Sequence, residues 1–276
     1  MIVAIDVGGT KTRFGLAYSS GEIFTESVMP TPQDSSTALL EVSRELARLS
    51  EGMKIDAIGV ACPGAIDKPS GMILDAHNVP WRGLNIVQHL GADFDCQVVL
   101  ENDAAAGGIA EARLGAGCSA RLVVFMTIST GVGMSIILDG KLLPTRHNSE
   151  GGAQVISLRA ASGARLETLI SGPAIEQKYG MRASEITDPK VWDEIAQSLS
   201  AGIFNIITIV QPDVIVLAGG VSRHYAKFIT PLNAHLLQYN SIYPLPEIKQ
   251  ARFVETAPVV GMLLLAQDHI AQARQL

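Results

Sequence analysis

The sequence predicts an α/β protein built from two lobes of similar design. Two segments, 2–28 and 122–143, share one order of elements: an apolar strand, a glycine turn and a hairpin. Three short glycine turns directly follow apolar strands, as they do in open α/β sheets that bind ligands at strand ends. At 276 residues the chain is also long for one hydrophobic core, which favours two lobes.

The first repeat starts with an apolar run from Ile2 to Val7, which is typical of a buried strand. Strands are expected at 13–18 and 23–28, joined by the turn Ser19-Ser20-Gly21. Leucines and a valine at helical spacing predict a helix between residues 34 and 52. The residues that could cap its ends are Asp34, Ser35 or Ser36 at the start and Gly52 at the end.

The rest of the chain repeats this alternation. Strands are predicted at 57–61, 98–100, 122–128 and 214–217, and a hairpin joins 135–138 to 141–143 across Asp139-Gly140. Helices are predicted at 103–114, 191–209 and 259–273. We expect an N-terminal lobe at 1–107, a C-terminal lobe at 108–258, and a final helix, about 259–276, that packs back on the first lobe.

Composition excludes several classes of protein. Hydrophobic residues make up 47% of the chain and charged residues 17%, which describes a packed globular protein. The net charge of −6 argues against nucleic-acid binding. The three cysteines form no CxxC pair, and no apolar stretch is long enough to span a bilayer. We expect a cytoplasmic protein with no nucleic-acid or membrane partner.

Asp103 is the leading candidate for a catalytic residue. It follows the apolar run Val98-Val99-Leu100 and the polar pair Glu101-Asn102, and a helix of small residues begins at once. The carboxyl ends of strands are where open α/β sheets hold ligands. Asp is also common as a helix N-cap, so a purely structural role is the alternative.

Three glycine turns are suited to phosphate binding, because glycine lets backbone N–H groups approach phosphate oxygens closely. They are Asp6-Val7-Gly8-Gly9-Thr10-Lys11-Thr12, Thr130-Gly131-Val132-Gly133 and Ala218-Gly219-Gly220-Val221-Ser222. Neither a Walker A pattern nor a G-x-G-x-x-G fingerprint is present. The carboxylate of Asp6 would hold Mg²⁺ through water rather than phosphate directly.

Taken together, these segments resemble the bacterial ROK sugar kinases. The matching runs appear in the family's order: 6–11, Ala61-Cys62-Pro63-Gly64-Ala65-Ile66-Asp67, Glu101-Asn102-Asp103, 129–133, Glu150-Gly151-Gly152 and 217–222. The resemblance implies the two-lobed actin-like fold, a duplicated ribonuclease-H-like fold. It also implies ATP and Mg²⁺ as cofactors, a hexose as substrate, and a homodimer as a plausible assembly.

The resemblance also implies a role for each site residue. Asp103 would take the proton from the sugar 6-hydroxyl as that oxygen attacks the γ-phosphate. Asp6 would lie near Mg²⁺. The expected sugar-binding residues are Asn78, Asn102, Asp103, Glu150 and Glu167. The expected ATP-binding residues are Gly8, Gly9, Thr10, Lys11, Thr130, Gly131, Gly219 and Gly220, the last two lying under the adenosine.

The chain departs from the family pattern after Glu150. Where the family has a histidine that contacts sugar and binds structural zinc, this sequence has Ala153, and residues 157–166 include no cysteine. Zinc needs nitrogen or sulfur ligands, so we predict no zinc site. Met134 and Ser135 also stand where the second phosphate turn usually has small residues.

Three functions compete at this point. The first is an ATP-dependent hexose kinase, with glucose as the default substrate. The second is a kinase for an N-acylhexosamine such as N-acetylmannosamine, for which Ala153 would leave room. The third is a sugar-binding regulator without catalysis. We expect no DNA-binding helix-turn-helix, because the first strand begins at Ile2.

Overall fold

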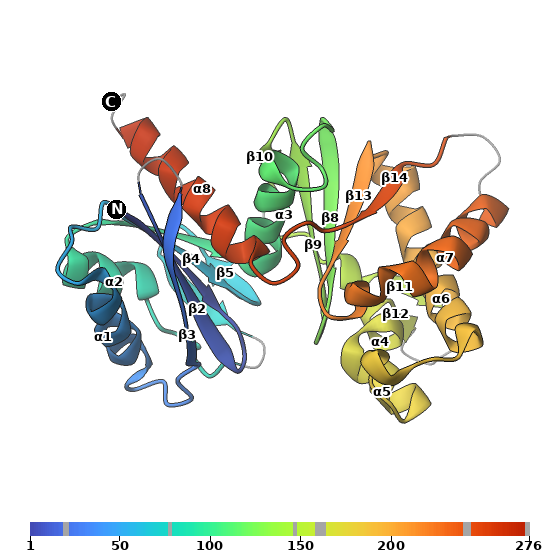
Figure 1. Cartoon of the computed structure of the whole chain (residues 1–276), viewed down its shortest axis with the longest axis horizontal. Coiled ribbons are helices and arrows are strands. Elements are labelled where there is room, and N and C mark those ends of the chain that lie inside the picture. Colours follow the sequence, from blue (N-terminus) through green and yellow to red (C-terminus); the bar gives the residue numbers. More distant parts are fainter. Residues whose placement is uncertain (19–21, 77–78, 146–147, 158–163, 240–243, 274–276) are drawn as a thin grey trace. The chain divides into compact units, whose positions relative to one another are not determined.

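The computed structural model describes residues 1–18, 22–76, 79–145, 148–157, 164–239 and 244–273 (Figure 1). The chain forms two compact units. Unit 1 comprises Met1–Ala110 and Thr256–Leu276, and unit 2 comprises Glu111–Glu255. No helix in the described ranges is both long enough and apolar enough to cross a bilayer.

Unit 1 is built on a five-stranded sheet in the order β3-β2-β1-β4-β7. The first three strands run antiparallel, and β4 and β7 continue the sheet parallel to β1. Their bounds are β1 Ile2–Val7, β2 Lys11–Ala17, β3 Ile23–Pro30, β4 Ala57–Cys62 and β7 Gln97–Asn102. A small hairpin, β5 (Ala65–Asp67) and β6 (Met72–Asp75), follows β4.

Helices cover both faces of this sheet. α1 (Ala38–Ser50) and α2 (Ile86–Phe94) share a core with one face of β1, β2 and β4. α8 (Ala257–Ala273) packs on the other face (Figure 1), and α3 (Asp103–Leu114) contacts α8, where a Cβ on Gly261 would meet the Ala106 carbonyl. A Cβ on Gly59 would stand 2.6 Å from the Met262 carbonyl oxygen, so α8 lies directly against the strand. The C-terminal helix therefore belongs to the core of unit 1.

Unit 2 repeats the arrangement, with the sheet order β10-β9-β8-β13-β14. β8 is antiparallel to β9 and parallel to β13, just as β1 is to β2 and β4. The bounds are β8 Leu122–Ile128, β9 Val132–Leu138, β10 Lys141–Leu142, β13 Val214–Ala218 and β14 Glu247–Gln250. The duplicated layout predicted from the sequence is confirmed.

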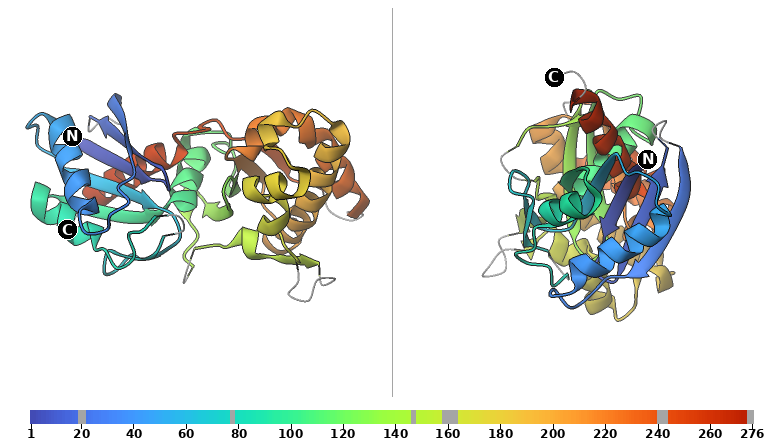
Figure 2. Two further views of the ribbon diagram at one scale, coloured as in Figure 1. Left: turned by 90° about the horizontal axis from the view of Figure 1, so that it is seen from below. Right: turned by 90° about the vertical axis from the view of Figure 1, so that its left-hand side faces the viewer.

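The helices of unit 2 share one hydrophobic core with its sheet, centred on Trp192 and Phe228. The two longest, α6 (Pro189–Val210) and α7 (Tyr225–Tyr239), lie side by side (Figure 2). The smaller elements are α4 Glu167–Ile170, α5 Gly172–Tyr179, the hairpin β11 Val155–Ser157 with β12 Ala164–Arg165, and the 3-10 turns η1 Gly151–Ala153, η2 Ala183–Glu185 and η3 Val221–His224.

The start of the first helix differs from the prediction. α1 begins at Ala38 after Thr37, and no side chain caps it. Asp34 instead closes a local turn, in which its carboxylate accepts the Ser36 N–H at 2.9 Å. An Asp that bonds two residues ahead stabilises a turn, so the chain enters the helix later than the capping pattern indicates. The hairpin β5–β6 and the helix α2 were not predicted.

Candidate active site

Three parallel strands of unit 1 bring the predicted acidic residues to one edge of the sheet. In the register of the sheet Asp6 on β1 lies opposite Ala61 on β4, and Cys62 on β4 lies opposite Asn102 on β7. Asp103 comes next, as the first residue of α3. The carboxylates that the sequence places 97 positions apart therefore meet at the same carboxyl edge, where open sheets bind ligands.

Asn102 rather than Asp103 caps helix α3. The Asn102 Oδ1 accepts the N–H groups of Ala104 at 2.9 Å and Ala105 at 3.2 Å, which is the N-cap pattern. Asp103 Oδ1 accepts the N–H of Ala104, and its side chain is only partly buried. The capping role proposed as the structural alternative for Asp103 is thus filled mainly by its neighbour.

Asp6 is buried, and its carboxyl group is electrostatically coupled to Asp103. Burial, and secondly the negative charge of Asp103, raise the pKa of Asp6 to about 7, while Arg13 opposes the shift. Arg13 lies directly opposite Asp6 on β2. Two carboxyl groups so close leave negative charge that a divalent cation would offset.

The turn between β1 and β2 is a candidate phosphate cradle. The N–H of Gly8 is used within the turn, donating to the Lys11 carbonyl at 3.0 Å. The N–H groups of Gly9 and Thr10 make no hydrogen bond within the described parts of the chain, so they remain available as donors. Lys11 and Thr10 are exposed. The predicted phosphate residues therefore lie on an accessible turn.

Thr12, the last residue of the first segment predicted to bind phosphate, faces the interior. Its side chain is fully buried, and its hydroxyl lies 3.0 Å from that of Thr31. Because Thr31 gives its own proton to the Gly8 carbonyl at 2.6 Å, Thr12 must be the donor of the pair. Thr12 and Thr31 thus support the glycine turn from below.

In unit 2, the corresponding turn between β8 and β9 carries Thr130 and Gly131. The Ser129 N–H donates to the Gly131 carbonyl at 2.9 Å, and the Ser129 carbonyl accepts the N–H of Gly172 at 2.7 Å. Glu167 reaches this turn, since a Cβ on Gly131 would stand 3.8 Å from Glu167 Oε2. The structure thus brings together Glu167, an expected sugar-binding residue, and Gly131, an expected ATP-binding residue.

Glu150 precedes two glycines, Gly151 and Gly152. Any larger residue at either position would force neighbouring atoms to move. A Cβ on Gly151 would stand 2.8 Å from Met134, and one on Gly152 would stand 2.5 Å from the Val132 carbonyl. The turn η1 therefore packs closely on β9, with Met134 buried beneath it. This packing leaves Glu150 exposed at the start of η1.

The third glycine pair divides into two roles. Gly219 has a φ of +88°, and a Cβ there would stand 2.5 Å from the Ile128 carbonyl oxygen, so the fold itself requires glycine. Gly220 has an ordinary φ of −60° and no atom within 4 Å of a built Cβ. Of the two glycines in this pair, Gly220 is therefore the one that packing does not require to be glycine.

Asn78 lies outside the described residues, so its predicted sugar contact stays a prediction. Cys62 is buried, and burial together with the charges of Asp103 and Asp6 raises the pKa of its thiol, which keeps it unreactive. Glu101 and Lys68 were missed. Their side chains form an ion pair beside Asn102, which no local sequence pattern signals.

The donor set suits Mg²⁺ better than zinc. Within the described ranges no three His, Cys, Asp or Glu side chains are grouped to hold a metal ion. Mg²⁺ prefers oxygen ligands and is commonly held by one or two carboxylates together with substrate phosphates and water. Asp6 fits that description, whereas the absence of a zinc site stays a prediction.

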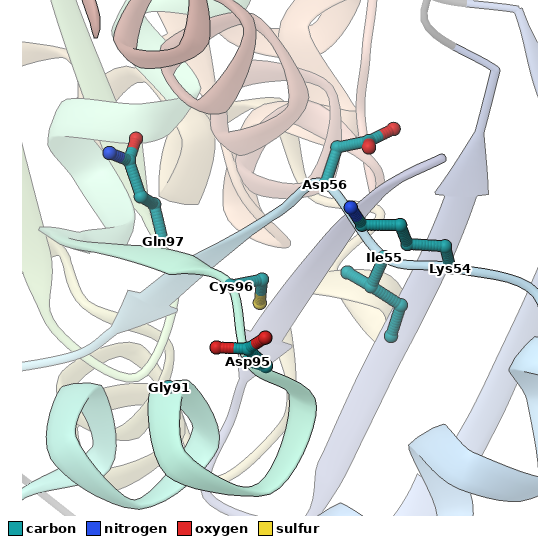
Figure 3. Close-up of a pocket in the computed structure, with 7 residues that line it drawn as sticks. All are labelled: Lys54, Ile55, Asp56, Gly91, Asp95, Cys96 and Gln97. Carbon is teal, nitrogen blue, oxygen red and sulfur yellow. The ribbon is translucent and has the colours of Figure 1, made fainter.

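A pocket in unit 1 lies away from these residues. It is lined by Lys54, Ile55, Asp56, Gly91, Asp95, Cys96 and Gln97 (Figure 3). Asp56 and Gln97 stand at the amino-terminal ends of β4 and β7, the edge opposite Asp103. This pocket is therefore not part of the candidate active site.

Comparisons with known proteins agree with the architecture. A glucokinase from Halalkalibacterium halodurans is 27% identical over 86% of this chain and 85% of its own length. Among solved structures, a ROK family glucokinase from Streptomyces griseus in complex with glucose and AMPPNP is 24% identical, has a TM-score of 0.81 and covers 97% of this chain and 99% of its own. A candidate N-acetylmannosamine kinase from Listeria monocytogenes, 24% identical, has a TM-score of 0.83 and covers 99% of both chains.

These structural matches confirm the predicted actin-like fold with two ribonuclease-H-like halves. The profile of the ROK family matches residues 2–269, almost the whole chain. The motifs that carried the resemblance lie within that range. The chain belongs to the ROK family.

Proposed function

We propose that this chain is an ATP-dependent sugar kinase that phosphorylates a hexose, with glucose as the first substrate to test. The observation that carries the proposal is the position of Asp103. Its partly exposed carboxyl group stands at a strand end beside Asp6, and Asn102 relieves it of most of the capping role. A carboxylate so placed is suited to general-base catalysis.

In the proposed reaction the sugar 6-hydroxyl oxygen forms a bond to the γ-phosphorus of ATP. Its proton passes to the Asp103 carboxylate, and the bond to the β-phosphate oxygen breaks to release ADP. An alcohol is too weak an acid to be ionised beforehand by a carboxylate. Asp103 therefore orients the hydroxyl and accepts the proton late in the reaction.

The phosphate groups are assigned to the glycine turns. The free N–H groups of Gly9 and Thr10 and the exposed Lys11 offer donors and positive charge from unit 1. Thr130 and Gly131 offer the matching turn of unit 2, and the open surface at Gly220 suits the adenosine. Bound Mg²⁺ would neutralise phosphate charge, with Asp6 as its carboxylate.

The sugar is assigned to Asn102, Asp103, Glu150 and Glu167, with Asn78 as a further expected contact. Carboxylates and amides suit the rim of a sugar, because each can accept from or donate to neighbouring hydroxyls. Asn102 uses its Nδ2 to donate to the Gly64 carbonyl at 3.3 Å, so its orientation is already fixed.

An N-acylhexosamine is the second candidate substrate, because of Ala153. This residue is exposed directly after the buried pair Gly151-Gly152 and ends with a methyl group where the family has a ring. The shorter side chain leaves space for an acyl substituent on the sugar. The similarity to the Listeria protein supports testing N-acetylmannosamine beside glucose.

A coupled assay of ADP release over a panel of hexoses and N-acylhexosamines, with ATP and Mg²⁺, tests the proposal. We expect turnover with at least one sugar and little ADP release without sugar. A parallel arm with polyphosphate as donor should show less product, because the net charge of −6 does not favour a polyanion. Inactivity with every sugar and both donors would refute a kinase.

A further inference from the structure

We infer that Glu101 and Lys68 form a positioning pair that fixes the sugar-binding side of the active site, and this inference rests on the proposed function. Neither residue is among those assigned to substrate. Glu101 is buried at the end of β7, with 6% of its surface exposed, directly before Asn102 and Asp103. A buried carboxylate at such a point requires a partner.

Both oxygens of Glu101 are engaged. Oε2 accepts Lys68 Nζ at 2.6 Å, and Oε1 accepts the backbone N–H of Asn102 at 2.8 Å. The first contact joins two elements 33 residues apart in the sequence, and the second holds the backbone that leads into the helix cap. One carboxylate therefore links Lys68 to the strand end that presents Asp103.

Lys68 lies in the turn of the hairpin β5–β6, and the same hairpin has a second tie to the strand end. Asn102 Nδ2 donates to the Gly64 carbonyl just before β5. Gly64 has a φ of +80°, and a Cβ there would collide with the Asp75 carbonyl, so the base of the hairpin leaves no room for a side chain. Two polar ties thus connect the hairpin to residues 101–102.

The far side of the hairpin turn is anchored elsewhere. Asn85, which caps α2 through its Oδ1, donates from Nδ2 to the Ser70 carbonyl at 2.8 Å. The Ile73 N–H donates to the Leu84 carbonyl at 3.0 Å. With this side held by α2, the Lys68–Glu101 pair sets how the hairpin stands relative to Asp103.

This placement matters for sugar because the pair holds the strand end that carries Asn102 and Asp103, both expected sugar contacts. Glu101 fixes the backbone of Asn102, and the Lys68 ammonium group in turn fixes Glu101. Among the described residues, the phosphate turn at 8–11 shares no hydrogen bond or ion pair with either member of the pair. Loss of the pair should misplace sugar ligands while leaving the nucleotide ligands in position.

The test is a comparison of Lys68→Met and Lys68→Arg with the wild type. Met keeps the aliphatic stem but removes the charge, whereas Arg restores the ion pair. We expect Lys68→Met to raise the KM for sugar about tenfold, with the KM for ATP and kcat changed less than about threefold. Lys68→Arg should recover most of the loss.

The matched control is Arg48→Met, which removes an ion pair with Glu45 on the surface of α1 in the same unit. It should leave both KM values unchanged. If Lys68→Met changes the KM for sugar no more than this control does, the pair does not position sugar ligands. A rise in the KM for sugar that is matched by an equal rise in the KM for ATP and an equal fall in kcat would also overturn the inference. Such a pattern indicates general destabilisation.

Amide hydrogen exchange of the protein without substrates gives a readout that does not depend on activity. Lys68→Met should speed exchange in residues 64–75 and at Ala104 and Ala105, but not in α1. If no sugar is turned over by the wild type, the proposed function fails, and this exchange pattern still decides whether the pair holds the hairpin. Unchanged exchange in 64–75 would refute the tie itself.

Discussion

Units 1 and 2 share one sheet order and differ in the residues that come after equivalent strands. In unit 1 the fifth strand, β7, ends in Asn102 and runs at once into α3 with Asp103 at its start. In unit 2 the equivalent strand, β14, ends at Gln250, and residues 251–256 separate it from α8, so no acidic side chain stands directly at the strand end. The duplicated scaffold supplies two strand edges, and only one of them carries the candidate base.

The turns after the first strand of each unit differ as well. The turn after β1 is Gly-Gly-Thr, with free backbone N–H groups, whereas the turn after β8 is Ser-Thr-Gly and is tied to Gly172. After the fourth strand, unit 1 adds the β5–β6 hairpin and unit 2 adds Gly219, Gly220 and η3. Function thus depends on the residues placed at strand ends rather than on the repeated fold.

The largest effect is expected from Asp103→Asn, which tests whether chemistry is confined to unit 1. The amide oxygen of the new side chain can still accept the Ala104 N–H, but the amide cannot take the proton of the sugar 6-hydroxyl. We expect kcat to fall by about 10²–10⁴-fold with sugar binding retained, as measured by steady-state kinetics and calorimetry.

Asp139→Asn in the hairpin turn of unit 2 is the control for this change. Its φ of 50° is one that Asn adopts readily, so the variant should keep wild-type kinetics. Retention of more than about a tenth of kcat by Asp103→Asn would move the general base to another residue.

A smaller effect, on the free energy of unfolding, is expected to distinguish Gly219, which the fold requires, from Gly220. Gly219→Ala places a Cβ against the Ile128 carbonyl at a φ that disfavours side chains, and it should lower the free energy of unfolding by about 1–3 kcal/mol. Gly220→Ala meets no neighbour and should stay within about 0.5 kcal/mol of the wild type.

Urea unfolding measures both variants, and kinetics supply the second readout. Gly220→Ala should raise the KM for ATP if the adenosine rests on this surface. A large loss of stability in Gly220→Ala, with none in Gly219→Ala, would reverse the assignment of the two roles.

The most specific effect concerns the pH dependence of stability through Asp6. Its pKa is about 7 in the folded protein against an ordinary value of 3.8, so the folded state resists ionisation and loses stability as pH rises from about 4 to 7. Asp6→Asn removes this loss. We expect the variant to be more stable than the wild type at pH 8 and nearly equal at pH 4.

Chemical unfolding at the two pH values, without nucleotide or Mg²⁺, checks this expectation. Added Mg²⁺ and ATP should reduce the difference in stability between Asp6→Asn and the wild type at pH 8. The reason is that a bound cation favours the ionised carboxylate of the wild type. An equal gain in stability at both pH values would show that burial of charge is not the cause.

The sequence predicted the elements whose pattern is local. The repeated order of strand, glycine turn and hairpin is visible in the apolar runs at 2–7 and 122–128 and in the turn residues Asp139-Gly140, whose φ values of 50° and 72° fit a two-residue hairpin. The strand-end position of Asp103 was predicted from the same local pattern.

Contacts between distant segments could not be predicted in this way. The Lys68–Glu101 pair, the burial of Thr12 against Thr31 and the approach of Glu167 to Gly131 depend on how strands align in space. The short hairpin β5–β6 was missed because it is held by hydrogen bonds to distant segments, from Asn85 to the Ser70 carbonyl and from Asn102 to the Gly64 carbonyl. Whether the fold needs the first or the second glycine of the pair 219–220 likewise depends on a carbonyl of a distant strand, β8.

The place of α8 in unit 1 has a consequence for synthesis on the ribosome. Its residues Val259, Met262 and Leu263 complete the core beneath β1 and β4, yet they are translated after all of unit 2. Nascent unit 2 can therefore reach its native state while the earlier-made half still exposes one apolar sheet face. That half becomes complete last, and until then it is the part of the chain that a chaperone has most reason to shield.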